Sequence, residues 1–178
     1  MITTKEEIAG AVQTSFTAFA DYMAGLPEAA FTYTPAGKWS AGQHIEHLLR
    51  STRPVYMALG LPRFLLRLLF GKPNRQPRSY DELVTKYQAK LAAGGAASGR
   101  FVPPLVHFEQ KADKLQAFGR LQQKLQKRVL HLSDKKLDNY LLPHPLLGKL
   151  TLREMLYFTI YHTEHHLTIL HKQQSGQA

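Results

Sequence analysis

The sequence of 178 residues contains no cysteine. Disulfide bonds, thiolate zinc sites and cysteine nucleophiles are therefore excluded, and any metal must be held by histidine, carboxylate or water. The N-terminal MITTKEEIAG lacks the basic-then-apolar pattern of a secretory signal, and no apolar run reaches the length of a membrane span. We therefore expect a cytoplasmic protein without a membrane span.

Acidic residues are also few, with 13 Asp and Glu against 23 Lys and Arg, which gives a net charge of +10. Basic domains often bind the phosphates of nucleic acids. Here the basic residues are spread over segments that also carry Glu and Asp, and no known nucleic-acid-binding motif is present. A solvated basic surface is the favoured interpretation, and nucleic-acid binding is the less favoured alternative.

The composition is that of one globular domain, because hydrophobic residues make up 44% of the chain and charged residues 20%. We expect a single domain over residues 1–178. Four segments begin with a capping box, in which a Ser or Thr is followed three residues later by Glu or Gln. These pairs are Thr4 with Glu7, Ser40 with Gln43, Ser79 with Glu82, and Thr151 with Glu154.

Apolar residues at helical spacing predict four long amphipathic helices, over about 5–25, 40–59, 108–132 and 152–172. Pro54 lies inside the second of these, where a kink is expected. No segment has a convincing strand pattern. The fold class is therefore all-α, a four-helix bundle.

The stretch 60–78, GLPRFLLRLLFGKPNRQPR, mixes apolar and basic residues. A membrane-surface segment or a lid is one interpretation. We favour a short extra helical segment, between the second and third long helices, whose Leu and Phe side chains close one end of the bundle. The region AAGGAASGRFVPP that follows is expected to be a flexible connection to the third long helix.

Two of the nine histidines lie on the inward face of the last helix. His162 and His166 share the stripe of Leu152, Met155 and Thr159, and spacing of i, i+4 stacks the two rings so that both can reach one ion. Two buried imidazoles side by side cost stability unless a cation or hydrogen bonds offset the burial. A metal site and a pair of neutral core histidines are about equally favoured by this pattern.

The motif is not that of a zincin, because Thr163 stands where the catalytic Glu would follow the first His. A third ligand must come from another helix, where His44 and His47 are both available. Helical periodicity puts His44 nearer the apolar edge and His47 on the more polar side, and it does not choose between them. Three other histidines are weaker candidates for a ligand, because they are expected in loops or at helix ends: His107, His131 and His144.

Two segments together resemble the DinB/YfiT-like superfamily. WSAGQHIEHL, from Trp39 to His47, is similar to its second helix, which begins with Trp-Ser and carries a metal-binding His eight residues after the Trp. The segment HPLLGKLTLREMLYFTIYHTEHH, from His144 to His166, is similar to its last helix with the preceding loop. The resemblance implies a metal held by His47, His162 and His166, and so selects His47 over His44.

The same resemblance implies zinc or nickel with an open coordination position, which activates a thiol or water nucleophile. The implied function is that of a thiol S-transferase, using a thiol such as bacillithiol, or of a hydrolase acting on a small molecule. The alternative is a non-catalytic metal-binding or stress-associated module. A homodimer is expected from the resemblance. Basic Arg50 and Arg53 are candidates for steering an anionic thiol, although simple exposure is the favoured interpretation for each.

Overall fold

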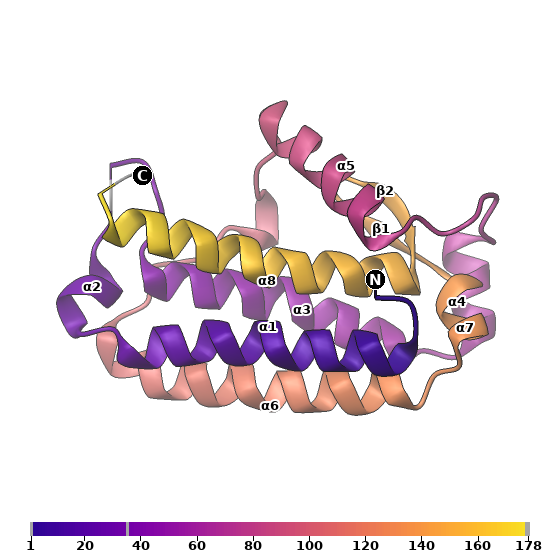
Figure 1. The fold of residues 1–178 in the computed structure, drawn as a ribbon, viewed down its shortest axis with the longest axis horizontal. Coiled ribbons are helices and arrows are strands. Elements are labelled where there is room, and N and C mark those ends of the chain that lie inside the picture. The colour runs from indigo at the N-terminus through magenta and orange to yellow at the C-terminus, as the bar shows by residue number, and fades with distance from the viewer. Residues whose placement is uncertain (1, 35, 177–178) are drawn as a thin grey trace.

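Four long helices form the body of the protein. The structure, a computed structural model, describes residues 2–34 and 36–176. The long helices are α1 (Lys5–Gly25), α3 (Ala41–Leu59), α6 (Lys111–Leu130) and α8 (Leu152–Gln174). They lie along the long axis of the molecule, with α1 and α8 running in one direction and α3 and α6 in the other (Figure 1). This confirms the predicted four-helix bundle.

The helices do not follow one another around the bundle. Helix α1 packs against α6 and α8, and α3 packs against the same two helices. Helices α1 and α3 are consecutive long helices, yet they do not pack against each other as neighbours. The chain therefore crosses between opposite corners of the bundle. The last helix consequently lies beside α3, which brings the two histidine-bearing segments together.

Shorter elements connect and cover the long helices. Helix α5 packs on the outer side of α8, above the bundle in Figure 1. The complete set is α2 (Glu28–Thr32), α4 (Arg63–Phe70), α5 (Tyr80–Ala92), α7 (Asp134–Asp138), the 3-10 turns η1 (Gly99–Phe101) and η2 (Phe108–Gln110), and strands β1 (Leu141–His144) and β2 (Gly148–Thr151). The extra helical segment expected between the second and third long helices is thus two helices, α4 and α5.

All four predicted capping boxes are present and start α1, α3, α5 and α8. In each, the hydroxyl accepts a hydrogen bond from the backbone N–H three residues on, while the Glu or Gln side chain accepts one from the backbone N–H of the cap. Each box satisfies two backbone donors that the helix leaves free. Local chemistry therefore sets the start of these helices before any packing does.

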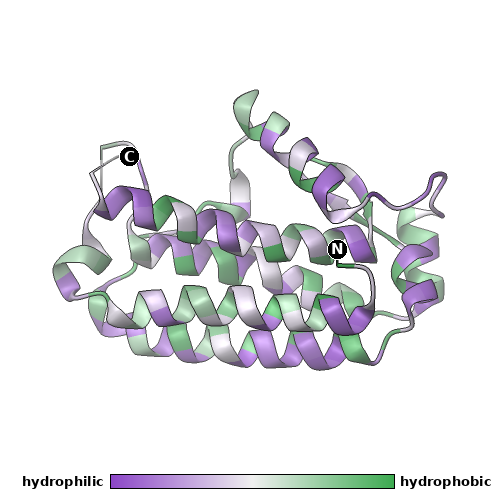
Figure 2. Cartoon of the chain, in the orientation of Figure 1, coloured by the Kyte–Doolittle hydropathy of each residue, from purple (hydrophilic) through white to green (hydrophobic). Residues whose placement is uncertain are grey.

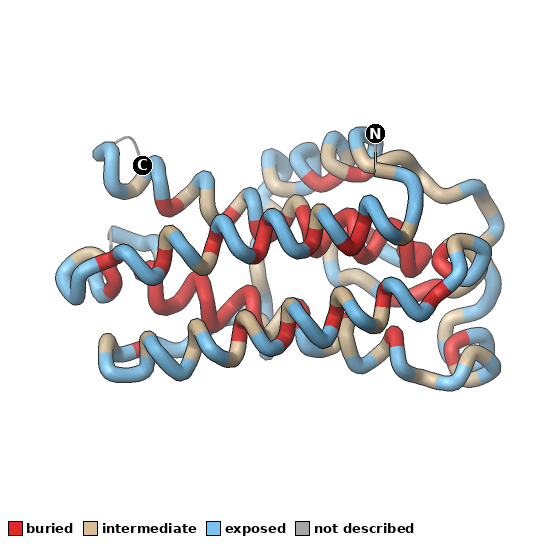
Figure 3. Tube along the Cα trace, turned by 60° about the horizontal axis from the view of Figure 1, so that its bottom comes forward, coloured by how far each residue is buried: buried red, intermediate tan, exposed pale blue. Residues whose placement is uncertain are grey.

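The core lies between the long helices, whose apolar sides face inward (Figure 2) and whose buried residues line the interior of the bundle (Figure 3). The apolar stripe of α1 is buried throughout; its residues are Ile8, Val12, Phe16, Phe19 and Met23. Phe16 of α1 stacks on Phe118 of α6 with ring centroids 4.5 Å apart. Such offset ring contacts add to the stabilisation that burial of the rings provides.

A short antiparallel hairpin precedes α8, and the expectation that the chain has no strand is wrong. Leu141 pairs with Thr151 and His144 with Gly148, so each strand has only four residues. A run this short carries too little alternation to be distinguished from a loop. The turn requires Gly148, whose φ of 76° is unfavourable for other residues.

The expectation for 60–78 is only partly correct. Helix α4 forms, and its Leu66 is fully buried. However, Phe64 and Leu68 are 73% and 78% exposed, and Leu69 is exposed as well. An eight-residue helix beside the hairpin can bury only the side that faces the protein, so half of its apolar side chains do not close the bundle.

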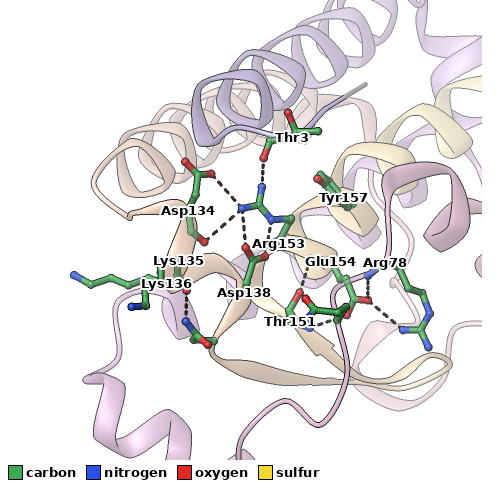
Figure 4. Close-up of polar contacts among 12 residues, drawn as sticks. Thr3, Arg78, Asp134, Lys135, Lys136, Asp138, Thr151, Arg153, Glu154 and Tyr157 are labelled. Carbon is green, nitrogen blue, oxygen red and sulfur yellow. Dashed lines mark hydrogen bonds and ion pairs between the residues drawn. The ribbon is translucent and has the colours of Figure 1, made fainter.

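Ion pairs anchor the start of α8 to its surroundings (Figure 4). The fully buried carboxylate of Glu154 accepts hydrogen bonds from both Nη atoms of Arg75, at 2.6 and 2.8 Å, and from the backbone N–H of Arg78. The neighbouring Arg153 pairs with Asp138 of α7 at 2.6 Å and donates to the carbonyl of Thr3. These contacts hold the N-terminus, α7 and the α4–α5 connection on α8.

Among the described residues, no helix combines the length and the apolar character needed to cross a bilayer.

Candidate metal site

Three histidines from two helices meet at the centre of the α3–α8 contact. The Nε2 atom of His162 lies 3.1 Å from Nε2 of His47 and 3.0 Å from Nε2 of His166. One ring nitrogen of each residue falls within 4.8 Å of the other two, and all three residues are buried. We call these residues the histidine cluster. Its members are the three residues that the sequence resemblance selects.

The ring of His47 is held so that its free nitrogen faces the cluster. Its Nδ1 lies 2.7 Å from the carbonyl oxygen of Phe101, and a carbonyl can only accept, so Nδ1 carries the proton. The neutral ring then presents the lone pair of Nε2 to His162. A backbone carbonyl that fixes the tautomer in this way is the usual outer partner of a metal-binding histidine.

An ion-pair network around the buried Glu46 holds the segment that supplies this carbonyl. Arg50 donates through Nε to Glu46 at 2.7 Å, and through Nη1 to the carbonyls of Arg100 and Val102, each at 3.2 Å. Lys114 of α6 donates to the second oxygen of Glu46 at 2.7 Å. Arg50 therefore helps to position η1 and the residue that follows it.

His44 contacts the cluster without joining it. Its Nδ1 lies 2.7 Å from Nδ1 of His166, so one of the two rings donates to the other. When Nε2 of His166 binds an ion, its Nδ1 carries the proton and His44 is the acceptor. The structure therefore gives the two histidines of α3 different positions, with His47 in the cluster and His44 behind His166.

Burial keeps these rings neutral. It lowers the pKa of His162 and of His166 well below the usual value, and the neighbouring histidines lower both further. Burial also lowers the pKa of His47, although the hydrogen bond to Phe101 opposes this shift. Neutral imidazoles are the form that binds a metal, and three of them leave the ion's double positive charge uncompensated.

The arrangement fits a divalent cation. Zinc–nitrogen bonds of 2.0–2.1 Å in a tetrahedral site separate the nitrogens by roughly 3.3 Å, close to the 3.0 and 3.1 Å of the cluster. Without a cation, three converging Nε2 atoms need protons between them, and the proton of His47 is already on Nδ1. Imidazole suits zinc and nickel equally, so the donor set does not distinguish them.

The remaining histidines lie outside the cluster. His107 and His131 are exposed, and His165 is half-buried on the neighbouring side of α8. Glu164 is exposed and accepts a hydrogen bond from the hydroxyl of Tyr80 at 2.9 Å. This carboxylate is therefore not part of the cluster.

The cluster lies at a cavity of about 500 Å³, which His47 and His162 help to line. His144, at the end of β1, lines the same cavity although the sequence ranks it low. The hairpin brings it there, so helical periodicity gives no signal for this position. Arg53 is exposed on α3 and, like Arg50, is not part of the cavity wall.

The comparisons with known proteins agree with this description. Among solved structures, YfiT from Bacillus subtilis, described as a probable metal-dependent hydrolase with an unusual four-helix bundle topology, matches with a TM-score of 0.61 and 17% identity, over 98% of this chain and 89% of that one. TT2238, a four-helix bundle protein, matches with a TM-score of 0.59 and 18% identity, over 94% of this chain and 98% of that one. A DinB-like protein from Bacillus cereus ATCC 10987 matches with a TM-score of 0.58 and 12% identity, over 99% and 95% of the two chains.

At these identities the structural matches establish the fold alone. The comparison with curated proteins gives no match. The family comparison is decisive, because residues 11–170 match the DinB superfamily, which is nearly the whole chain. This protein therefore belongs to the DinB superfamily.

Proposed function

We propose that the protein is a metal-dependent hydrolase of small molecules, with the metal held by His47, His162 and His166. The observation that carries the proposal is the convergence of three Nε2 atoms of buried histidines beside a cavity. Two of these histidines, His47 and His162, line the cavity. A divalent cation on three neutral imidazoles supplies a Lewis acid that activates water or a thiol near neutral pH.

The protein's own residues keep this site ready for a cation. Phe101 and His44 hold the outer nitrogens of His47 and His166, so the inner nitrogens need no reorganisation. The name of the structural neighbour YfiT, a probable metal-dependent hydrolase, supports the same chemistry. Zinc and nickel are the proposed ions, as the family resemblance implies.

We favour water over a thiol such as bacillithiol as the nucleophile. An anionic thiol needs cationic partners, and Arg50 is already bonded to Glu46 and to two carbonyls. Arg100 is the one cationic side chain on the described cavity wall, and it is exposed. Water needs no such partners.

Metal content, measured by mass spectrometry on tag-free protein, tests the proposal. We expect close to one zinc or nickel ion per chain, lost in His162→Ala and kept in the control His131→Ala, whose residue is exposed and far from the cluster in sequence. Hydrolysis of a panel of uncharged esters and amides should disappear with a chelator and return with the metal. A parent protein that binds no added zinc or nickel would refute the proposal.

A non-catalytic metal-binding module predicts the same metal content without turnover. The panel of substrates distinguishes the hydrolase from the non-catalytic module. A metal-loaded protein that hydrolyses none of the substrates supports the module. Added thiol provides a further distinction, since activity that requires bacillithiol would identify a transferase.

A further inference from the structure

The wall of the cavity beside the histidine cluster is mostly apolar, and its residues come from helices α3, α4, α5 and α8, from strand β1 with the turn that follows it, and from the segment 96–101. Six of these residues show its character: Val55, Ala58, Leu91, Leu142, Met155 and Phe158. No Asp or Glu of the described chain lines the cavity. Its volume of about 500 Å³ lies within the 300–1,000 Å³ of typical ligand sites.

Charge at the cavity is confined to its outer part. Arg100 is exposed, and its guanidinium carbon lies 5.1 Å from the centre of the Phe101 ring, where it covers that ring. Away from the histidine cluster, a charged group of a ligand would lose its hydration on entering without finding an ionic partner on the wall in return. The wall therefore selects against charged molecules and favours an uncharged, apolar one.

One uncharged donor is fixed within this apolar wall. The Nδ1 atom of His144 accepts hydrogen bonds from the backbone N–H groups of Leu146 and Leu147, at 3.2 and 3.1 Å. The neutral ring must then carry its proton on Nε2. His144 packs on Phe158, with ring centroids 4.2 Å apart, and Phe158 in turn stacks on His162 at 4.7 Å.

We infer that this cavity takes an uncharged acyl compound, an amide or an ester, whose hydrocarbon chain lies along the apolar wall and whose carbonyl lies at the histidine end. The inference rests on the proposed hydrolase function and names its substrate class. In the hydrolysis of an amide, the oxygen of water bonds to the carbonyl carbon and the C–N bond breaks. One proton of water goes to the departing amine, and a carboxylic acid and an amine are the products.

The apolar wall has a measurable consequence, because each methylene that leaves water on binding raises the affinity by about fourfold. The test uses the straight-chain amides from butanamide to octanamide, which displace the neutral fluorophore N-phenyl-1-naphthylamine from the metal-loaded protein. We expect about fourfold tighter binding for each added methylene. The same trend is expected after chelator treatment, since the wall does not depend on the metal.

A variant that fills the cavity serves as the structural control. Ala58 lines the cavity on α3, and Ala58→Phe should weaken octanamide at least tenfold while affecting butanamide less. The matched control is Ala112→Phe on the exposed side of α6, which should leave the series unchanged. Circular dichroism and metal content verify that both variants fold.

The outcomes separate this inference from the proposed function. If the affinity does not depend on chain length, or if Ala58→Phe leaves octanamide binding intact, the substrate class is wrong even when the protein holds one metal per chain. If the chain-length trend appears but the parent binds no metal, the apolar site stands and the hydrolase proposal falls.

Discussion

Replacing His44 tests the division of roles between the two histidines of α3. In the structure His44 bonds Nδ1 of His166 at 2.7 Å, whereas His47 points its Nε2 at His162. The substitution His44→Leu removes the acceptor but no ligand. Loss of such an outer partner lowers metal affinity by about 10- to 100-fold, equivalent to roughly 1.4–2.7 kcal/mol.

The magnitude follows from the burial of the contact. Both rings are almost wholly enclosed, with exposed fractions of 3% for His44 and 5% for His166. Water therefore cannot replace the lost acceptor, and a buried donor without a partner costs about 1–3 kcal/mol. His44→Asn places an amide oxygen near the position of Nδ1 and should recover part of the affinity.

The assay is competition for zinc against a chromophoric chelator, with His131→Leu as control and His47→Leu for comparison. We expect stoichiometric but weaker binding in His44→Leu, almost none in His47→Leu, and no change in the control. If His44→Leu abolished binding while His47→Leu retained it, His44 would be the ligand and the assignment would be refuted.

Three further predictions concern stability. Glu154→Gln should lower the free energy of unfolding in urea by about 2–3 kcal/mol; this lies at the low end for a buried pair because Arg75 is a third exposed and can regain water. Burial alone would raise the pKa of Glu154, but hydrogen bonds from Arg75 and from backbone N–H groups outweigh it and lower the pKa. Stability from this group is therefore complete above the ordinary carboxyl pKa and is lost as the pH falls toward the lowered one, so the acid unfolding of the Gln variant should be less steep below about pH 4. Gly42→Ala should cost about 1–2 kcal/mol in the same assay, because its Cβ would lie 2.8 Å from a ring carbon of Phe31; equal or greater stability would show that the neighbours move aside freely. Finally, removal of a metal present at 100 times its dissociation constant should lower the melting temperature by about 5–10 °C in calorimetry, and an unchanged value would mean that no metal binds the folded state.

The long helices were predictable because the information for them is local. A capping box lies within four residues, and an apolar stripe repeats along a single helix, as in α1 from Ile8 to Met23. The hairpin was not predicted, and the burial of α4 was predicted only in part. Both depend on neighbours that are distant in sequence. Leu66 is buried while Phe64 is exposed. Which of the two side chains is buried depends on how α4 packs beside β1.

The candidate site divides in the same way. The i, i+4 spacing of His162 and His166 alone places both rings on one face of a helix, and resemblance to a family adds His47. Periodicity could not separate His47 from His44, because both rings are buried in the structure. The distinction depends on the direction of each ring nitrogen, which the carbonyl of Phe101 and the ring of His166 determine.

By itself, then, the sequence determined the four long helices, the starting residues of three of them and the histidine pair of α8, because these depend on contacts within one helix. The tertiary structure alone decided the diagonal order of the helices, the role of Arg50 in holding η1, and the place of His144 on an apolar cavity wall. These features depend on contacts between segments far apart in the chain, and a local sequence pattern does not predict such contacts.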